Sequence, residues 1–179
     1  MAALHQVSAG VEDDACITLY SILARLLTLR PEPALLSHLA DAERALPVAP
    51  RDVTRAWQRV VFAAVLLGTD AIAREFDRLF SPDEPVVDLN ASSYAAGQDF
   101  ADEHLGVLCG SMHSLACFAI PRQREFFRAR IAPWYRAPLL GLKAEPRANF
   151  YRHVATLALA FLDAEERTLR PVPHRHPPG

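Results

Sequence analysis

Residues 149–165 read NFYRHVATLALAFLDAE, and this segment indicates most directly how the chain folds. Its apolar side chains recur every three or four residues, as at Phe150, Val154 and Leu157, and this is the period of one face of an α-helix. Pro146 lies just ahead, and a proline fits the first turn of a helix because the N–H group that it lacks would have no partner there. We therefore predict a long C-terminal helix that opens at Pro146.

The same helical period recurs through most of the chain, and few segments alternate in the manner of β-strands. The first helix is expected to start near Asp13 or Asp14, which can cap its free N–H groups, and to stop at Pro31. A short helix over residues 35–39 should follow, until Pro47 breaks the chain again.

Two further helices are expected in the first half of the chain. Asp52 suits the N-cap of the third helix, and Gly68 lies where a left-handed C-terminal cap would end it. Asp70 can then cap a fourth helix, which carries Ile72 on its apolar face. Helical patterning fails over residues 81–101, where Pro, Asn, Ser and Gly predict a long hinge loop.

The second half is expected to begin with a helix from about Asp102 to Pro121, and another helix should start at Pro121. Pro133 and Pro138 should bracket a short piece that contains Trp134. We therefore predict an all-α fold, a single helical bundle in which two groups of helices are joined by an acidic hinge loop.

Composition supports a folded domain over residues 1–170, with a disordered tail at residues 171–179. The chain has 179 residues, of which 51% are hydrophobic and 22% charged, enough for one domain with a proper core. A net charge of −2 argues against general affinity for nucleic acid or anionic membranes. The longest apolar run, residues 60–67, is far shorter than the roughly 20 residues that span a bilayer, so no membrane span is expected.

The cysteines and the N-terminal residues bear on the compartment. Cys16, Cys109 and Cys117 form no close pair, which is typical of a protein in a reducing environment. Residues 1–14 have no basic segment followed by an apolar run, so no signal peptide is predicted. We expect a cytoplasmic protein.

Acidic residues are concentrated around the predicted hinge. Residues 70–103 hold nine Asp or Glu and two Arg, a net charge of −7, whereas residues 104–179 carry +6. An acidic loop between two groups of helices is a suitable dock for a basic peptide. The alternative is a solvated surface loop whose acids only keep the protein soluble.

His104 is the first candidate for chemistry, because it follows Asp102 and Glu103 at the expected start of a helix. The two carboxylates suit the positive end of the helix dipole and could raise the pKa of the imidazole, as acid–base catalysis requires. The alternative is an acidic first turn followed by an ordinary surface histidine.

A metal site is the second candidate. Cys109, His113 and Cys117 share one helix face, but the outer two are separated by a rise of about 12 Å, so one ion could use only two of them. No second cluster supplies the missing ligands, and cysteines buried on the core side are the alternative. The chain has no GxGxxG, GxxxxGK[ST] or GxSxG motif, which removes support for nucleotide-binding and α/β-hydrolase functions.

Four segments resemble the redox-enzyme maturation chaperones of the TorD/DmsD/NarJ group. CITLYSILARLLTLRPEP, residues 16–33, is similar to the family's opening helix. FFRARIAPWYRAPLLGL, residues 126–142, and the segment 149–165 follow the family's order of Pro-Trp, Phe-Tyr-Arg and Ala-Phe-Leu. YAAGQDFADEHLGVLCGSM, residues 94–112, resembles its hinge, although Phe100 and Ala101 replace the family's usual Glu and Pro.

The resemblance implies a TorD-like chaperone that is not an enzyme and has no cofactor of its own. Its partner would be the twin-arginine signal peptide, or the apo-form, of a molybdopterin-containing oxidoreductase, whose export it delays until the cofactor is inserted. Carboxylates beside an apolar groove would suit such a peptide, since arginine presents a fork of donors to carboxylates. The hinge would permit either a monomer or a domain-swapped dimer.

The candidate contacts combine acidic and apolar residues. Tyr20 has a hydroxyl on an otherwise aliphatic stripe, so it could line a groove, or it could be a half-buried core residue. The predicted peptide-binding residues are Asp99, Asp102, Glu103, His104, Tyr20, Tyr94 and Met112. The rival class is a small helical enzyme that uses His104 with Glu103, or a metal at Cys109 and His113.

Overall fold

The computed structural model describes residues 16–42, 49–91, 103–116 and 120–170. Every named element within these ranges is a helix, and the only strand-like feature there is an isolated antiparallel bridge between Asn90 and His104. The predicted all-α fold class is therefore confirmed for the part of the chain that the structure describes. The expected tail at residues 171–179 lies outside it.

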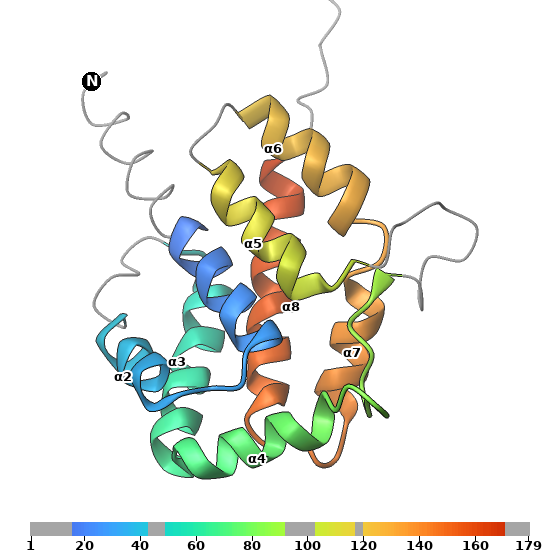
Figure 1. The fold of residues 1–179 in the computed structure, drawn as a ribbon. Helices are drawn as coiled ribbons and strands as arrows, with labels where there is room; N and C mark the ends of the chain where they lie inside the picture. Colours follow the sequence, from blue (N-terminus) through green and yellow to red (C-terminus); the bar gives the residue numbers. More distant parts are fainter. Residues whose placement is uncertain (1–15, 43–48, 92–102, 117–119, 171–179) are drawn as a thin grey trace, which may run out of the picture.

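The helices follow one another as Figure 1 shows. The first helix, which has no label in Figure 1, spans Cys16–Thr28. It is followed by α2 (Pro33–Ala42), α3 (Arg51–Leu67), α4 (Thr69–Leu79), α5 (Leu105–Leu115), α6 (Ile120–Phe126), η2 (Phe127–Ile131), α7 (Arg136–Ala144) and α8 (Tyr151–Thr168). The element η2 is a short π-helix that continues α6 directly.

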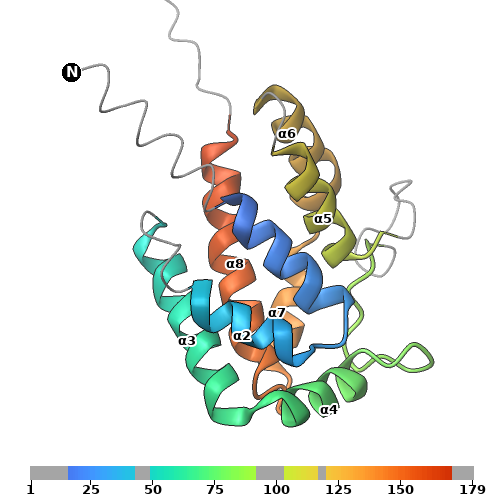
Figure 2. The ribbon, with the colours of Figure 1, turned by 60° about the vertical axis from the view of Figure 1, so that its left-hand side comes forward.

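Helix α8 lies at the centre of the bundle, as both views show (Figures 1 and 2). Helices α3 and α7 both pack extensively against it. The first helix also packs on it, because the rings of Tyr20 and Phe161 meet edge to face with centroids 4.7 Å apart. The predicted apolar face of α8 is buried, with Val154 and Leu157 fully inaccessible. Since α3 and α8 come from different halves of the chain, both halves share one core.

The start of α8 is fixed by a carboxylate from another helix. Glu75 of α4 is buried and accepts hydrogen bonds from the backbone N–H of Phe150, at 2.9 and 3.1 Å, and of Tyr151, at 2.8 Å. The first N–H groups of a helix have no partner within the helix, so this contact satisfies them. The helix therefore begins at Tyr151, and the prediction that it opens at Pro146 was wrong.

Other predicted boundaries were also wrong. Asp52 and Asp70, which were expected as N-caps, lie in the first turns of α3 and α4. Helix α5 begins at Leu105, later in the chain than expected, and its N-cap is His104. Pro138 was expected to interrupt the chain, yet it lies inside α7. Pro138 is in the first turn of that helix, where its missing N–H group costs no hydrogen bond.

Residue Gly68 separates α3 from α4. Its φ of 74° is strongly disfavoured for side chains other than glycine, and its N–H donates to Ala64 O at 3.1 Å. The prediction that a glycine ends this helix at positive φ is confirmed, although ψ of 162° differs from that of a left-handed helical residue. No single helix in the described ranges has the length and apolar character to cross a bilayer; α3 and α4 meet these criteria only as a pair, bent by 108°.

Candidate functional site

The segment that joins the two halves is acidic where the structure describes it. Residues 80–91, with the first turn of α5, lie on one side of the bundle in both views (Figures 1 and 2). Residues 80–91 and 103–104 include Asp83, Glu84, Asp88 and Glu103 and have no Lys or Arg. The described part of the predicted acidic hinge is thus a local concentration of negative charge.

Backbone contacts hold the end of this segment against α5. The N–H of Ala91 donates to Glu103 O at 3.0 Å, and the N–H of Leu105 donates to Leu89 O at 2.8 Å. Leu89 and Ala91 are buried, and the carboxylate of Asp88 accepts from the backbone N–H of Asn90 at 2.9 Å. The segment therefore has a fixed course up to residue 91.

Residue Glu103, a predicted contact, is already paired. Its carboxylate receives both the Nε of Arg130, at 2.8 Å, and the Nη2 of Arg130. The backbone oxygen of Arg130 in turn accepts from Trp134 Nε1 at 2.7 Å. This two-point contact joins the start of α5 to η2 and uses the geometry in which arginine binds carboxylates best. A peptide arginine would have to displace Arg130 to reach Glu103.

His104, another predicted contact, serves as the N-cap of α5. Its Nδ1 accepts a hydrogen bond from the N–H of Gly106 at 3.1 Å, so Nδ1 carries no proton in this arrangement. Burial lowers the pKa of His104, and the nearby charge of Asp88 opposes that shift. Gly106 is needed here because an added Cβ would lie 2.6 Å from Thr28 Cγ2. His104 is therefore a neutral structural cap.

The acid–base pair that the rival enzyme would need is not formed in this conformation. The Glu103 carboxylate turns to Arg130, while the His104 ring turns to its own helix. Neither contact joins Glu103 to His104. The pKa of His104 is lowered, whereas the sequence hypothesis called for it to be raised by neighbouring carboxylates.

Of the four carboxylates in the acidic segment, the two most accessible were not among the predicted contacts. Asp83 and Glu84 are exposed, and neither has an ion pair or hydrogen bond with another described residue. Their presence in the acidic block of the sequence was the only signal for them. Val86, 36% exposed, lies within this acidic segment, and Val107, 56% exposed, lies in the first turn of α5.

The predicted apolar contacts lie in the core. Met112 is fully buried, as is Leu105, and Leu108 is almost so. Tyr20 is 2% exposed, and its hydroxyl donates to Glu165 Oε2 at 3.0 Å. Burial raises the pKa of Tyr20 well above its usual value, and the charge of Glu165 raises it further. Of the two alternatives for Tyr20, a groove residue or a core residue, the structure shows the core residue.

The remaining predicted contacts, Tyr94, Asp99 and Asp102, lie outside the described residues. They belong to residues 92–102, between the acidic segment and the start of α5. Because both ends of that interval are held together by the Asn90–His104 bridge, the described residues on either side of it are neighbours. The three residues remain predictions.

The residues of the candidate metal site have different surroundings. Cys109 is fully buried, and burial raises the pKa of its thiol to about 12, which disfavours the thiolate that binds metals. His113 Nδ1 lies 3.0 Å from the backbone oxygen of Ile17. Cys117 lies outside the described residues, and within them no three His, Cys, Asp or Glu side chains are grouped to hold a metal.

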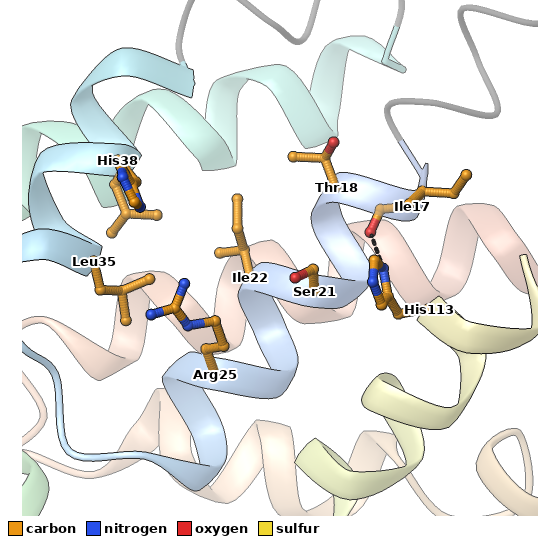
Figure 3. Close-up of a pocket in the computed structure, with 9 residues that line it drawn as sticks. Ile17, Thr18, Ser21, Ile22, Arg25, Leu35, His38 and His113 are labelled. Atoms are coloured by element: carbon orange, nitrogen blue, oxygen red, sulfur yellow. Dashed lines mark hydrogen bonds between the residues drawn. The ribbon is translucent and has the colours of Figure 1, made fainter.

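A cavity of about 280 Å³ lies between the first helix, α2 and the end of α5 (Figure 3). Polar groups enter it from three elements: Ser21 and Arg25 from the first helix, His38 from α2 and His113 from α5. It lies at the opposite end of α5 from His104. Because its ionisable groups are basic, it does not suit a peptide arginine.

Comparison of the chain with protein-family models, curated proteins and solved structures finds no match. The family resemblance and the TorD-like arrangement that it implies therefore remain predictions.

Proposed function

We propose that this protein is a client-binding chaperone, with a peptide site at the acidic segment of residues 80–91 and 103–104. Its client would be the twin-arginine signal peptide or the apo-form of a molybdopterin oxidoreductase, held in the cytoplasm until the cofactor is inserted. The observation that supports this most is the pair of exposed carboxylates, Asp83 and Glu84, in a segment without a cationic side chain.

The two exposed carboxylates match an arginine pair in charge and in geometry. An arginine pair offers two planar guanidinium groups, each of which can bind a carboxylate through two N–H donors. Asp83 and Glu84 are adjacent, and neither has a partner among the described residues, so within that part of the chain they can receive such groups without first losing a contact. Single exposed ion pairs contribute only about 0.2–1 kcal/mol each, so useful affinity requires several carboxylates acting together.

Glu103 can join the site by exchanging its partner. Its present contact with Arg130 is the two-point geometry that a client arginine would reproduce. Side-chain exposures of 22% for Glu103 and 37% for Arg130 leave the pair open to solvent. A client arginine would therefore compete with Arg130, and loss of Arg130 should strengthen client binding.

The test is a calorimetric titration of the full chain with a synthetic twin-arginine signal peptide. We expect saturable binding that weakens when lysines replace both arginines, because lysine lacks the two-point contact. The double variant Asp83→Asn, Glu84→Gln should weaken binding by roughly tenfold. The matched control, Glu32→Gln with Glu125→Gln, removes two exposed carboxylates elsewhere and should leave binding unchanged.

The proposal would be overturned by an absence of saturable binding, or by equal losses in both double variants. Arg130→Ala provides an independent check, since it frees the Glu103 carboxylate and should tighten binding of the arginine peptide. Sedimentation of the complex would also distinguish a monomer from the domain-swapped dimer that the hinge would permit.

A further inference from the structure

The side of α3 that faces away from the core carries two arginines and three large apolar residues. Arg55, Arg59, Phe62 and Leu66 recur at helical intervals on one face, and Val65 lies beside them. Phe62, Val65 and Leu66 are 68%, 74% and 71% exposed. We call these five residues the α3 outer face. Apolar side chains grouped and exposed to this degree mark an interaction surface.

The opposite side of α3 supplies its packing. Val53, Trp57 and Val60 are at most 1% exposed and belong to the core. Figure 2 shows α3 at the edge of the bundle, next to α8 and α2. The α3 outer face is thus not needed for the packing of the described residues, and its apolar character has no structural explanation within them.

The basic end of this face is not neutralised. Arg55 and Arg59 are exposed, one helical turn apart, and neither has an ion pair within the described residues. His153 of α8 lies beside them, and its pKa is lowered by burial and, in addition, by the charges of Arg152 and Arg59. The surface therefore carries a local positive potential in a protein of net charge −2.

The arginines and Phe62 also border a hollow between α3 and α8. Its volume is about 390 Å³, and it is lined by Arg55, Gln58, Arg59, Phe62 and His153. Such a hollow can receive a side chain of a partner, with Phe62 and the two arginines on the α3 side and His153 on the α8 side. It thus offers both an apolar contact and a carboxylate site.

We propose that the α3 outer face binds an acidic amphipathic helix of a partner protein. Apolar residues of the partner would cover Phe62, Val65 and Leu66, and its carboxylates would meet Arg55 and Arg59. A helix that lays its apolar face on such a surface is a common form of recognition, and complementary charge fixes its direction. This inference is independent of the client site, because α3 does not contribute to the acidic segment.

The order of residues along α3 favours a protein helix over a lipid surface. Membrane-surface helices carry basic residues along the polar face that flanks their apolar strip. Here the basic residues Arg55 and Arg59 precede the apolar residues Phe62 and Leu66 on the same face. A partner helix with an acidic end and an apolar end matches this order.

The test uses fluorescence anisotropy with two labelled synthetic peptides and the full chain. Both peptides are amphipathic helices with a leucine ridge, and one carries glutamates at one end where the other carries lysines. We expect saturable binding of the glutamate peptide, roughly tenfold tighter than that of the lysine peptide. Arg55→Glu with Arg59→Glu should reverse this preference, and Phe62→Ser with Leu66→Ser should abolish binding. The substituted residues are exposed, so circular dichroism should report an unchanged fold.

Several outcomes would overturn the proposal. One is the absence of saturable binding, and another is a peptide preference that survives the charge reversal. Binding to phosphatidylserine vesicles that depends on Phe62 would assign the face to lipid. Concentration-dependent dimerisation that Leu66→Ser abolishes would assign it to a second copy of this chain.

Discussion

Replacing Glu75 with alanine should remove the cap that fixes the start of α8. The carboxylate accepts three contacts of 2.8–3.1 Å from the N–H groups of Phe150 and Tyr151, and both residues are fully buried. Alanine leaves two buried donors without a partner, and each costs about 1–3 kcal/mol, so the loss should be about 2–6 kcal/mol. Domains unfold with about 5–15 kcal/mol in total, so this is a large fraction of the stability.

The assay is urea unfolding followed by circular dichroism, with the free energy of unfolding taken from the transition. Glu75→Gln keeps one acceptor oxygen and removes the charge, so it should lose less than Glu75→Ala. The control Glu125→Ala changes an exposed carboxylate and should stay within about 0.5 kcal/mol of the parent chain. A loss below 1 kcal/mol for Glu75→Ala would refute the argument that this carboxylate satisfies buried donors.

Three further predictions concern the fold. Gly68→Ala should destabilise the protein by about 1–2 kcal/mol in the same assay, because φ at Gly68 is 74°. Gly141 lies in a helix with open space at the Cβ position, so Gly141→Ala should instead stabilise the protein by about 0.4–1 kcal/mol. A stabilising Gly68→Ala with a destabilising Gly141→Ala would contradict the role of φ at Gly68. The pKa of His104 is lowered in the folded state, so the unfolded state binds a proton there at a higher pH than the folded state does. The free energy of unfolding should therefore fall as pH drops below about 6.5. His104→Asn keeps a capping oxygen but cannot titrate, so it should make stability depend less on pH. Urea transitions at several pH values measure this dependence, and an unchanged dependence would exclude His104 as its source. Cys109, with a thiol pKa of about 12, should react with a disulfide reagent far more slowly than half-buried Cys16, and equal rates in single-cysteine variants would disagree with its burial.

Local patterns predicted the elements whose structure depends on neighbouring residues. The apolar period of residues 149–165 identified α8 and the face that it buries. Gly68 was placed at a helix end because glycine tolerates positive φ, and it lies there. Such features are visible in sequence because the residues that cause them are close together along the chain.

Features that depend on distant residues were not visible. Glu75 caps α8 from 75 positions earlier in the chain, so no local pattern connects the two. Glu103 is occupied by Arg130 because η2 folds back on α5. Helical period alone could not tell whether Tyr20 lines a groove or fills the core, since both positions lie on an apolar stripe. Its hydroxyl found a buried partner in Glu165.

The sequence showed where acidic residues are concentrated but not how each carboxylate is placed. The charge block located an acidic segment, yet the exposed carboxylates within it are Asp83 and Glu84. His104, which the sequence offered as a contact, serves as a helix cap. Exposure depends on packing partners that a single sequence does not reveal, so the sequence could not tell which of these carboxylates are accessible.

Chemical-shift mapping by NMR can test directly whether the acidic segment binds a twin-arginine peptide. Isotope-labelled protein is titrated with the peptide, and the perturbed amides are assigned. We predict saturable shifts that cluster in residues 80–91 and the first turn of α5, with a change at Arg130 as its pair with Glu103 is exchanged. Shifts confined to other parts of the molecule, or no saturable shifts, would contradict the account.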